Sequence, residues 1–234
     1  MSKSKLVVLI GSPGSGKGTQ SLLLAEKRKM THLEASKLLE KRFLNAKDDD
    51  VIKVGENTYS LKEQERRWRK GLLCEDEFVS HVIKEALEAS YRKADTVLLD
   101  GYPRTVKQAE IALPSFISLF GKENILTVFL EVGEEEVVKR NTNRKVCSLM
   151  RHSIVDLPET RGLTVCPIDG SSLERRVMDD PKTIKVRVKE FKKKTFPVLD
   201  YFSSQGVKVS RVDGVGTIND VLFRILKEVE DFGI

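Results

Sequence analysis

A phosphate group can be held by residues 11–20, which read Gly-Ser-Pro-Gly-Ser-Gly-Lys-Gly-Thr-Gln. Closely spaced glycines let a loop curl until several backbone N–H groups converge on one anion, and the dipole of a following helix adds a favourable field. Lys17 supplies a mobile positive charge for the outer phosphates, and Thr19 offers a hydroxyl on the metal side. This hydroxyl comes one position later than in the common pattern, because Gly18 follows the lysine. The predicted phosphate-binding residues are Gly14, Ser15, Gly16, Lys17, Gly18 and Thr19.

A second stretch with chemically useful residues begins at Asp100 and ends at Gln108. Asp100 closes an apolar strand, where a carboxylate that associates with the metal belongs in a phosphate-loop architecture. Arg104 can grip a phosphate with two parallel hydrogen bonds. Gln108 follows one helical turn later and can pair with a base edge through one donor and one acceptor. Together with Gly101, Arg104 and Gln108 are candidates for binding a phosphorylated substrate.

The strands that must position these residues are predicted from four apolar runs, at 6–10, 96–99, 125–130 and 207–212. Strands buried on both faces are typical of parallel sheets, and helical patterns separate the runs. One long helix is expected over residues 180–203 and another over 217–232, whereas residues 48–61 have the pattern of an insertion that bears a hairpin. The predicted fold class is therefore α/β with a parallel sheet.

Length, charge and cysteine usage narrow the class of protein. The 234 residues can form one α/β domain with inserted subdomains, and no apolar run has the ~18 residues of a membrane helix. The net charge of +6 does not indicate nucleic-acid binding, because acidic and basic residues are interspersed and only 6% are aromatic. Three cysteines argue against a disulfide framework and for a reducing compartment. We expect a soluble, cytoplasmic protein that binds small phosphorylated molecules, with neither nucleic acid nor a membrane as partner.

Both stretches resemble the hallmark motifs of the adenylate kinase family. Every fixed position of the family loop Gly-x-Pro-Gly-x-Gly-Lys-Gly-Thr-Gln is present, and the motif Leu-Asp-Gly-Phe-Pro-Arg-Thr-x-x-Gln-Ala-Glu differs only at Tyr102. The resemblance covers nearly the whole chain and implies a P-loop three-layer sandwich with a five-stranded parallel sheet. It also implies a core of residues 1–30, 78–145 and 176–234, a monophosphate-binding insertion at 31–77, and a lid at 146–175.

The family resemblance also implies an activity. Such an enzyme uses ATP and Mg²⁺ and transfers the terminal phosphoryl group of MgATP to a nucleoside monophosphate. The presence of Gln108 favours AMP as the acceptor, and Arg104 would position the acceptor phosphate. We expect the protein to act as a monomer on nucleotides.

Further arginines match family residues that neutralise charge on the transferring phosphoryl group, namely Arg140, Arg144, Arg176 and Arg187. Arg140 and Arg144 are spaced to share one face of a helix expected at 134–145. Near the end of the chain, Gly216 belongs to a turn that would suit the close approach of a purine.

The sequence departs from the family pattern at the acceptor helix. The family reads Ser-Thr-Gly-Asp-Leu-Leu-Arg, with the arginine on the acceptor phosphate, whereas residues 34–40 read Glu-Ala-Ser-Lys-Leu-Leu-Glu. Glu40 would therefore repel a phosphate at this position. Two roles remain open for Lys37, which either takes over the phosphate or pairs with Glu40. Trp68 either stacks on the acceptor base or packs the insertion against the helices.

The predicted lid raises the question of a metal. Related lids can hold zinc through two short pairs of ligands, and the four matching positions here are Cys147, Met150, Cys166 and Asp169. A thioether is a poor zinc ligand, although His152 is close enough in sequence to substitute for it. We expect a lid without metal, with Cys147, His152, Cys166 and Asp169 as weak candidates for zinc ligands.

Two other functions are compatible with the sequence. The first is a kinase for another nucleoside monophosphate or a related small acceptor. The second is a nucleotide-binding regulatory protein whose acceptor site has degenerated. Arg104 and the arginines at the predicted lid argue against the second function, because a protein without phosphoryl transfer has no need for them.

Overall fold

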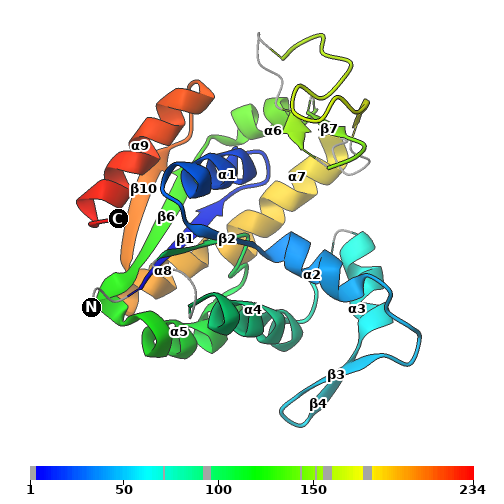
Figure 1. The fold of residues 1–234 in the computed structure, drawn as a ribbon, viewed down its shortest axis with the longest axis vertical. Coiled ribbons are helices and arrows are strands. Elements are labelled where there is room, and N and C mark those ends of the chain that lie inside the picture. The colour runs from blue at the N-terminus through cyan, green and yellow to red at the C-terminus, as the bar shows by residue number, and fades with distance from the viewer. Residues whose placement is uncertain are drawn as a thin grey trace.

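A five-stranded sheet lies at the centre of the computed structural model, which describes residues 4–70, 72–91, 96–142, 144–150, 152–154, 160–175 and 181–234 (Figure 1). The strands are parallel and their order is β10-β6-β1-β5-β2. They comprise Lys5–Gly11 (β1), Thr31–Glu34 (β2), Thr96–Asp100 (β5), Ile125–Glu131 (β6) and Lys208–Asp213 (β10). The four apolar runs are thus confirmed as strands, and the sheet has the five parallel strands that the family resemblance implies.

The register of the sheet brings its functional ends together. Leu6 is level with Val97 of β5 and Ile125 of β6, so the central strand β1 is flanked on both sides by apolar residues. At the other end of the strands, Glu34 is level with Asp100. The loops that leave the carboxyl ends of β1, β2 and β5 therefore begin side by side, at the edge where parallel sheets bind ligands.

Helices cover both faces of the sheet. Alternate residues of β1 point to opposite faces. Val7 and Leu9 pack with α1 and α9, whereas Leu6 and Val8 pack with α4, α5 and α8. The bounds of these helices are Lys17–Lys27 (α1), Asp76–Tyr91 (α4), Val106–Phe120 (α5), Pro197–Ser204 (α8) and Ile218–Asp231 (α9). A short 3-10 helix, Lys122–Asn124 (η1), leads into β6.

Two insertions extend from the core. The first contains the predicted hairpin, which projects away from the sheet in Figure 1. Its elements are Ala35–Phe43 (α2), Val51–Val54 (β3), Asn57–Ser60 (β4) and Leu61–Arg69 (α3). The second follows Glu134–Thr142 (α6) and forms a small antiparallel sheet of Lys145–Cys147 (β7), Ser153–Ile154 (β8) and Leu173–Arg175 (β9). The sequence showed no clear strand pattern there, because these strands have only two or three residues.

The helix expected over 180–203 is present in the described residues but is not one continuous α-helix. The chain instead forms Pro181–Glu190 (α7), a π-helical segment Phe191–Thr195 (η3), and α8. Pro197 has no N–H and cannot continue an ordinary helix, so it stands at the first position of α8. The preceding residue, Phe196, donates its N–H to the Phe191 carbonyl over 2.9 Å, which closes the wider π turn.

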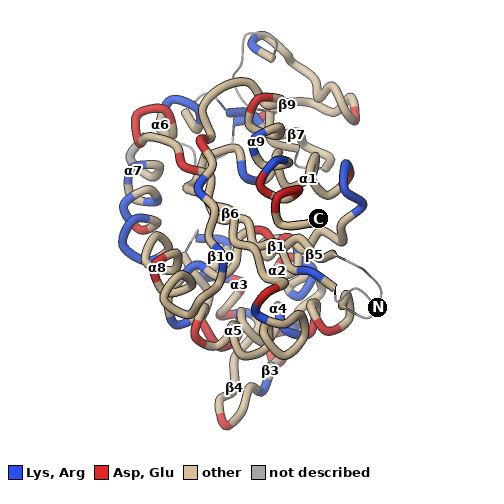
Figure 2. The backbone as a smooth tube through the Cα atoms, turned by 90° about the vertical axis from the view of Figure 1, so that its left-hand side faces the viewer, with Lys and Arg blue, Asp and Glu red and all other residues tan. Residues whose placement is uncertain are grey.

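The surface carries charges of both signs. Acidic and basic residues alternate over much of the chain, with basic residues frequent along α7 (Figure 2). Of the helices in the described ranges, none is long and apolar enough to cross a membrane.

Candidate active site

The phosphate loop connects β1 to α1. Gly14 and Gly16 have φ angles of 89° and 90°, which other residues rarely adopt. A Cβ atom on Gly14 would lie only 2.0 Å from Asn141 Nδ2, so close packing also requires glycine there. Gly16 caps α1 without any side-chain hydrogen bond. The first amides of α1 are thus available to an anion, because they have no acceptor within the helix.

Two serines give the phosphate loop further polar atoms without partners. The hydroxyl oxygens of Ser12 and Ser15 are buried, and neither has a hydrogen-bond partner among the described residues. Buried polar groups are normally satisfied, so these hydroxyls suit a polar ligand in the loop. In the first turn of α1, Gly18 is exposed and Thr19 is half-buried.

Lys17 reaches the end of the neighbouring strand. Its ammonium lies 3.1 Å from Asp100 Oδ1, and the carboxylate is 3% exposed. A cation and a carboxylate therefore meet beside the free helix amides. This arrangement fits a phosphate that carries a divalent cation, because the carboxylate supplies an oxygen of the kind that Mg²⁺ prefers.

The acceptor loop follows Asp100. Arg104 Nε donates to the Gly101 carbonyl over 2.7 Å, and the Arg104 N–H donates to Gln108 Oε1 over 2.8 Å. Thr195 Oγ1 donates to the Arg104 carbonyl over 2.8 Å. The guanidinium is thus held from one edge, while the side chain remains exposed. Gln108 is 1% exposed, which fixes its amide at the start of α5.

His32 lies in the same charged region, and the sequence favours a satisfied structural histidine there over a catalytic one, because no nucleophile and base pair stands near it in the chain. Burial lowers the pKa of its imidazole, and the carboxylates of Asp100 and Glu34 oppose this shift. Its Nε2 atom is buried and has no hydrogen-bond partner among the described residues. A lowered pKa keeps the imidazole neutral at pH 7, so His32 adds no charge to the site.

The predicted arginines occupy different environments. Arg140 Nε donates to Glu136 Oε1 over 2.8 Å, and Arg140 Nη1 donates to the Gly214 carbonyl over 3.0 Å. The helix α6 ends at Thr142. The prediction that Arg140 and Arg144 lie on one face of the same helix is therefore wrong. Arg144 is half-buried just beyond α6, and Arg187 is half-buried on α7. Arg176 lies outside the described residues.

Asn141 is a neighbour of the phosphate loop that the sequence did not reveal. Its Nδ2 atom donates to the Pro13 carbonyl over 2.8 Å and to the Val137 carbonyl over 2.8 Å. The side chain is completely buried and ties α6 to the loop. No motif marks an asparagine of this kind, because its role depends on a contact between residues far apart in the chain.

The turn after β10 contains glycines because a side chain at these positions would come too close to neighbouring residues. A Cβ atom on Gly214 would lie 2.5 Å from Val132 Cγ2. Gly216 has a φ of 123°, and a Cβ atom there would lie 3.1 Å from Asp220 Oδ2. Asp220 forms a capping box with Thr217 at the start of α9. Local geometry thus accounts for Gly216, and nothing in the structure tests its predicted approach to a purine.

On the acceptor helix, Lys37 forms an ion pair with Glu34 and not with Glu40. Lys37 Nζ lies 3.3 Å from Glu34 Oε2, and Ser36 Oγ donates to Glu34 Oε1 over 2.5 Å. Glu40 is exposed on α2. The alternative in which Lys37 pairs with Glu40 is therefore wrong. Glu34 could have been identified from its position at the end of a strand, since β2 places it level with Asp100.

Trp68 packs inside the first insertion. Its ring centroid lies 6.0 Å from that of Phe43, with the two planes tilted by 54°. The indole is half-buried against the core cluster that contains Phe43 and Phe78. These contacts match the packing alternative, and they leave the stacking alternative untested.

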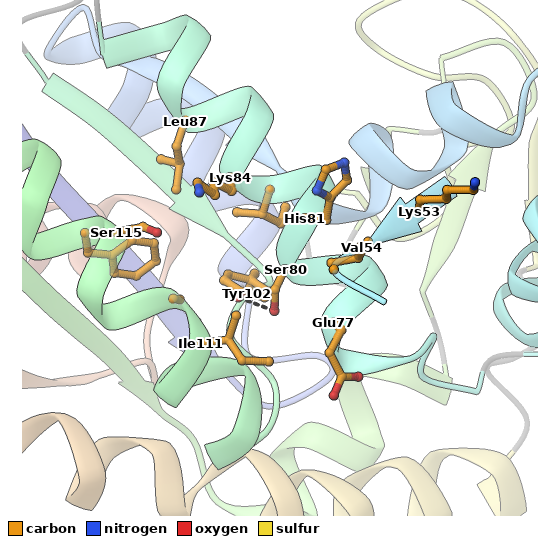
Figure 3. Close-up of a pocket in the computed structure, with 14 residues that line it drawn as sticks. Lys53, Val54, Glu77, Ser80, His81, Lys84, Leu87, Tyr102, Ile111 and Ser115 are labelled. Atoms are coloured by element: carbon orange, nitrogen blue, oxygen red, sulfur yellow. Dashed lines mark hydrogen bonds between the residues drawn. The ribbon is translucent and has the colours of Figure 1, made fainter. Parts of the chain in front are cut away.

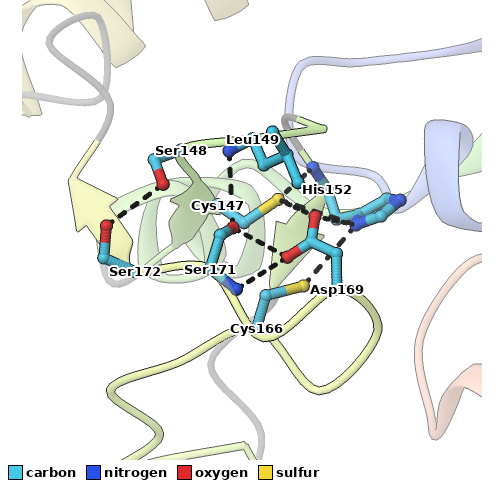
Figure 4. Close-up of polar contacts among 8 residues, drawn as sticks. All are labelled: Cys147, Ser148, Leu149, His152, Cys166, Asp169, Ser171 and Ser172. Carbon is cyan, nitrogen blue, oxygen red and sulfur yellow. Dashed lines mark hydrogen bonds and ion pairs between the residues drawn. The ribbon is translucent and has the colours of Figure 1, made fainter.

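The second insertion brings Cys147, His152, Cys166 and Asp169 together (Figure 4). His152 Nδ1 lies 3.6 Å from Cys147 Sγ, 3.5 Å from Cys166 Sγ and 3.2 Å from Asp169 Oδ2. A tetrahedral site with bonds of ~2.0–2.3 Å has ligand separations of ~3.3–3.8 Å. Two thiols, an imidazole and a carboxylate at these distances fit a zinc ion closely.

Surrounding contacts hold the carboxylate of this group in place. The N–H and the hydroxyl of Ser171 both donate to Asp169 Oδ1, over 3.0 and 2.7 Å. These bonds keep the pKa of the Asp169 carboxyl well below its usual range. Met150 is 59% exposed and does not belong to the group. His152 thus takes the place in the donor set that the family pattern gives to the position of Met150.

Comparisons with known proteins identify one family. A family model described as adenylate kinase matches residues 9–207. An adenylate kinase of Staphylococcus aureus strain Mu50 is 32% identical over 218 residues, which are 92% of this chain and 94% of the relative. An adenylate kinase of Methanothrix thermoacetophila is 32% identical over 228 residues, 97% of this chain and 99% of the relative. One from Staphylococcus epidermidis is 31% identical over 218 residues, again 92% and 94%.

Proposed function

This chain belongs to the adenylate kinase family and is a nucleoside monophosphate kinase, and on that premise we propose that its acceptor is AMP. One observation carries the proposal. The Lys17–Asp100 pair at the phosphate loop stands next to the loop that fixes Arg104 and Gln108. The proposed sites for the donor phosphates and for the acceptor would then share one edge of the sheet, which supports the proposal.

The residues of the chain divide into donor and acceptor roles. MgATP, when bound, supplies the phosphoryl group and the divalent cation. The amides of residues 14–19 and the Lys17 ammonium hold the donor phosphates, with Thr19 and Asp100 on the metal side. Arg104 orients the acceptor phosphate, whose oxygen is already an anionic nucleophile, so the reaction requires no general base. Charge on the transferring group is neutralised by Arg140, Arg144, Arg176 and Arg187.

Adenine recognition rests on Gln108. Its Oε1 atom accepts the Arg104 N–H, and its Nε2 atom has no acceptor within the described ranges. That amide group can donate to a ring nitrogen of a base. The buried position of Gln108 makes this interaction selective, because a base that leaves the amide unpaired loses a hydrogen bond in a dry site.

We also propose the division of the chain that the resemblance implies. Residues 1–30, 78–145 and 176–234 form the core, residues 31–77 the monophosphate-binding insertion, and residues 146–175 the lid. We expect a monomer, which analytical ultracentrifugation would test. In this division Glu34, Lys37 and Trp68 belong to the acceptor side, whereas Gly216 belongs to the donor side.

The geometry of the second insertion favours a structural zinc ion, contrary to the expectation from the sequence. Cys147, His152, Cys166 and Asp169 would hold the ion. Elemental analysis of the purified protein should find one zinc per chain, and Cys166→Ser should lose both the zinc and several degrees of Tm. Met150→Ala is the matched control and should keep both. Zinc-free protein with a Tm unaffected by Cys166→Ser would contradict the proposal.

An acceptor panel tests the proposed reaction. AMP, GMP, UMP and CMP are each supplied with MgATP, and ADP release is followed. AMP should give the highest kcat/KM, by at least ~10-fold. A higher kcat/KM with another monophosphate would replace AMP as the acceptor. ATP binding with no turnover on any acceptor would instead favour a regulatory protein.

A further inference from the structure

A cleft separate from the phosphate loop lies between the β3–β4 hairpin and helices α4 and α5 (Figure 3). Its volume of about 410 Å³ is much larger than the water-sized voids of a close-packed interior. The same volume falls within the range of small-molecule pockets. The cleft therefore has the size of a binding site and not of a packing defect.

The floor of the cleft is apolar. Ile83 and Leu87 of α4 and Phe116 of α5 line it, and all three side chains are almost fully buried. Tyr102 also lines it, and its hydroxyl donates to Ser80 Oγ over 2.8 Å (Figure 3). Because Tyr102 precedes Arg104 by two residues, the cleft backs onto the acceptor loop.

The rim of the cleft is charged, and its uncompensated charge is positive. Glu77 forms an ion pair with Lys107, so its negative charge is already matched. Lys84 has only a 3.9 Å contact with Glu88. Lys53, on the hairpin, is exposed and has no acidic partner within the part of the chain that the structure describes. Lys53 and Lys84 therefore favour an anionic group at the mouth.

We propose that this cleft binds a small amphipathic organic anion. Its apolar body, one or two rings in size, lies over this floor against Val54 and Ile111, the more exposed apolar residues of the lining, and its acid group meets a lysine of the rim. Burial of the rings against Val54 and Ile111 contributes to the affinity, and the rim lysines select the anion. The inference concerns a site outside the nucleotide cleft, so it holds whichever monophosphate is the acceptor.

Fluorescence titration with anilinonaphthalene sulfonate tests the proposal on the full chain. Saturating ADP fills the nucleotide sites, and the dye should still bind at one saturable site. Ser115→Trp places a large ring at the half-buried rim and should weaken binding by at least ~10-fold. Lys53→Gln should weaken it by ~3-fold or more, because the sulfonate loses a cation. Lys227→Gln, exposed on α9 across the sheet, is the matched control and should bind as the parent does.

The charge requirement is tested with N-phenylnaphthylamine, which has the same rings without the sulfonate. It should bind the cleft more weakly than the sulfonate does. Equal dye affinity in the parent, Ser115→Trp and Lys53→Gln would overturn the proposal, as would displacement of the dye by ADP or the lack of saturable binding. Should Ser115→Trp fail to fold, Lys53→Gln decides alone, because Lys53 is exposed. None of these readouts depends on turnover, so they stand apart from the acceptor panel.

Discussion

The phosphate loop and the acceptor helix α2 begin at the same edge of the sheet, yet they follow their family pattern to different degrees. Every fixed position of the loop motif is present, and the loop is fastened by Asn141 and by the Lys17–Asp100 pair. In α2, Glu40 is exposed where the family pattern has an arginine. Lys37 of the same helix forms an ion pair with Glu34, which immediately precedes the helix.

The contrast shows which kind of site tolerates change. The donor site is made largely of backbone amides in a conformation that needs glycine, so a substitution there disturbs the loop itself. The acceptor site is made of side chains on an exposed helix surface, where a charge can be replaced without altering the fold. Donor binding is therefore the half of the proposed mechanism that keeps the family motif, and acceptor binding is the half in which the sequence departs from it.

The largest expected effect is on the donor side. Lys17→Ala should lower kcat by at least ~100-fold while leaving the fold intact, because the lysine contributes charge and the glycines make the loop. Steady-state kinetics and circular dichroism would check both parts. Lys27→Ala, exposed at the other end of α1, is the control and should keep full activity. Activity of Lys17→Ala within about threefold of the parent would remove the basis for phosphoryl transfer at this loop.

The next largest effect is expected for Arg104→Ala, which distinguishes acceptor binding from donor binding. With Glu40 in place of a cation, Arg104 is the principal positive charge proposed for the acceptor phosphate. Its loss should raise the acceptor KM by ~10-fold or more and lower kcat, with little change in ATP affinity. Arg66→Ala, exposed on α3, should change neither constant. Weakened ATP binding in Arg104→Ala would show that donor and acceptor sites are not separable in this way.

Restoring the family's charge on α2 should have a moderate effect in the opposite direction. Glu40→Arg should lower the KM for AMP by up to ~10-fold, because a cation replaces an anion near the acceptor phosphate. Glu40→Gln, which only removes the negative charge, should give a smaller improvement. If Glu40→Arg abolishes activity with every monophosphate, Glu40 is itself a ligand of the acceptor, and the substrate is not the proposed one.

The smallest change in kinetics is expected at Trp68. Trp68→Leu removes ring contacts with Phe43, so it should lower the free energy of unfolding by ~1–3 kcal/mol and leave the KM for AMP within about twofold. Urea denaturation and initial rates would measure the two quantities. A large rise in KM with unchanged stability would instead support stacking of Trp68 on the acceptor base.

The sequence predicted the parts of the molecule that depend on local pattern. Apolar runs identified the strands, and glycine spacing identified the loop between β1 and α1. Asp100 and Arg104 were placed correctly near each other because a strand end and the loop after it are adjacent in the chain. The structure added contacts between distant residues, such as the one from Asn141 to Pro13, for which no local pattern exists.

Two contacts, one on the acceptor helix and one in the proposed lid, show why other side-chain positions could not be predicted from the sequence. Pairing of Lys37 with Glu34 depends on which rotamers reach across one helical turn, and the sequence allows Glu40 equally. The position of His152 depends on the turn between β7 and β8, which returns the chain to Cys147. A spacing rule for zinc ligands does not include this turn, so the sequence could name His152 as a substitute ligand but could not show that it reaches the other three donors.

The order of the strands affects the course of synthesis. The strand that precedes the phosphate loop, β1, is made before its neighbours, but it occupies the middle of the sheet, and those neighbours, β5 and β6, begin only at residues 96 and 125. Until those residues have been made, a fully apolar strand has neither partner, and unpaired apolar strands are prone to aggregate. The phosphate-loop motif thus follows a strand that lacks both sheet partners until residue 131 has been made, and slow elongation over that stretch would prolong the exposure of an aggregation-prone strand.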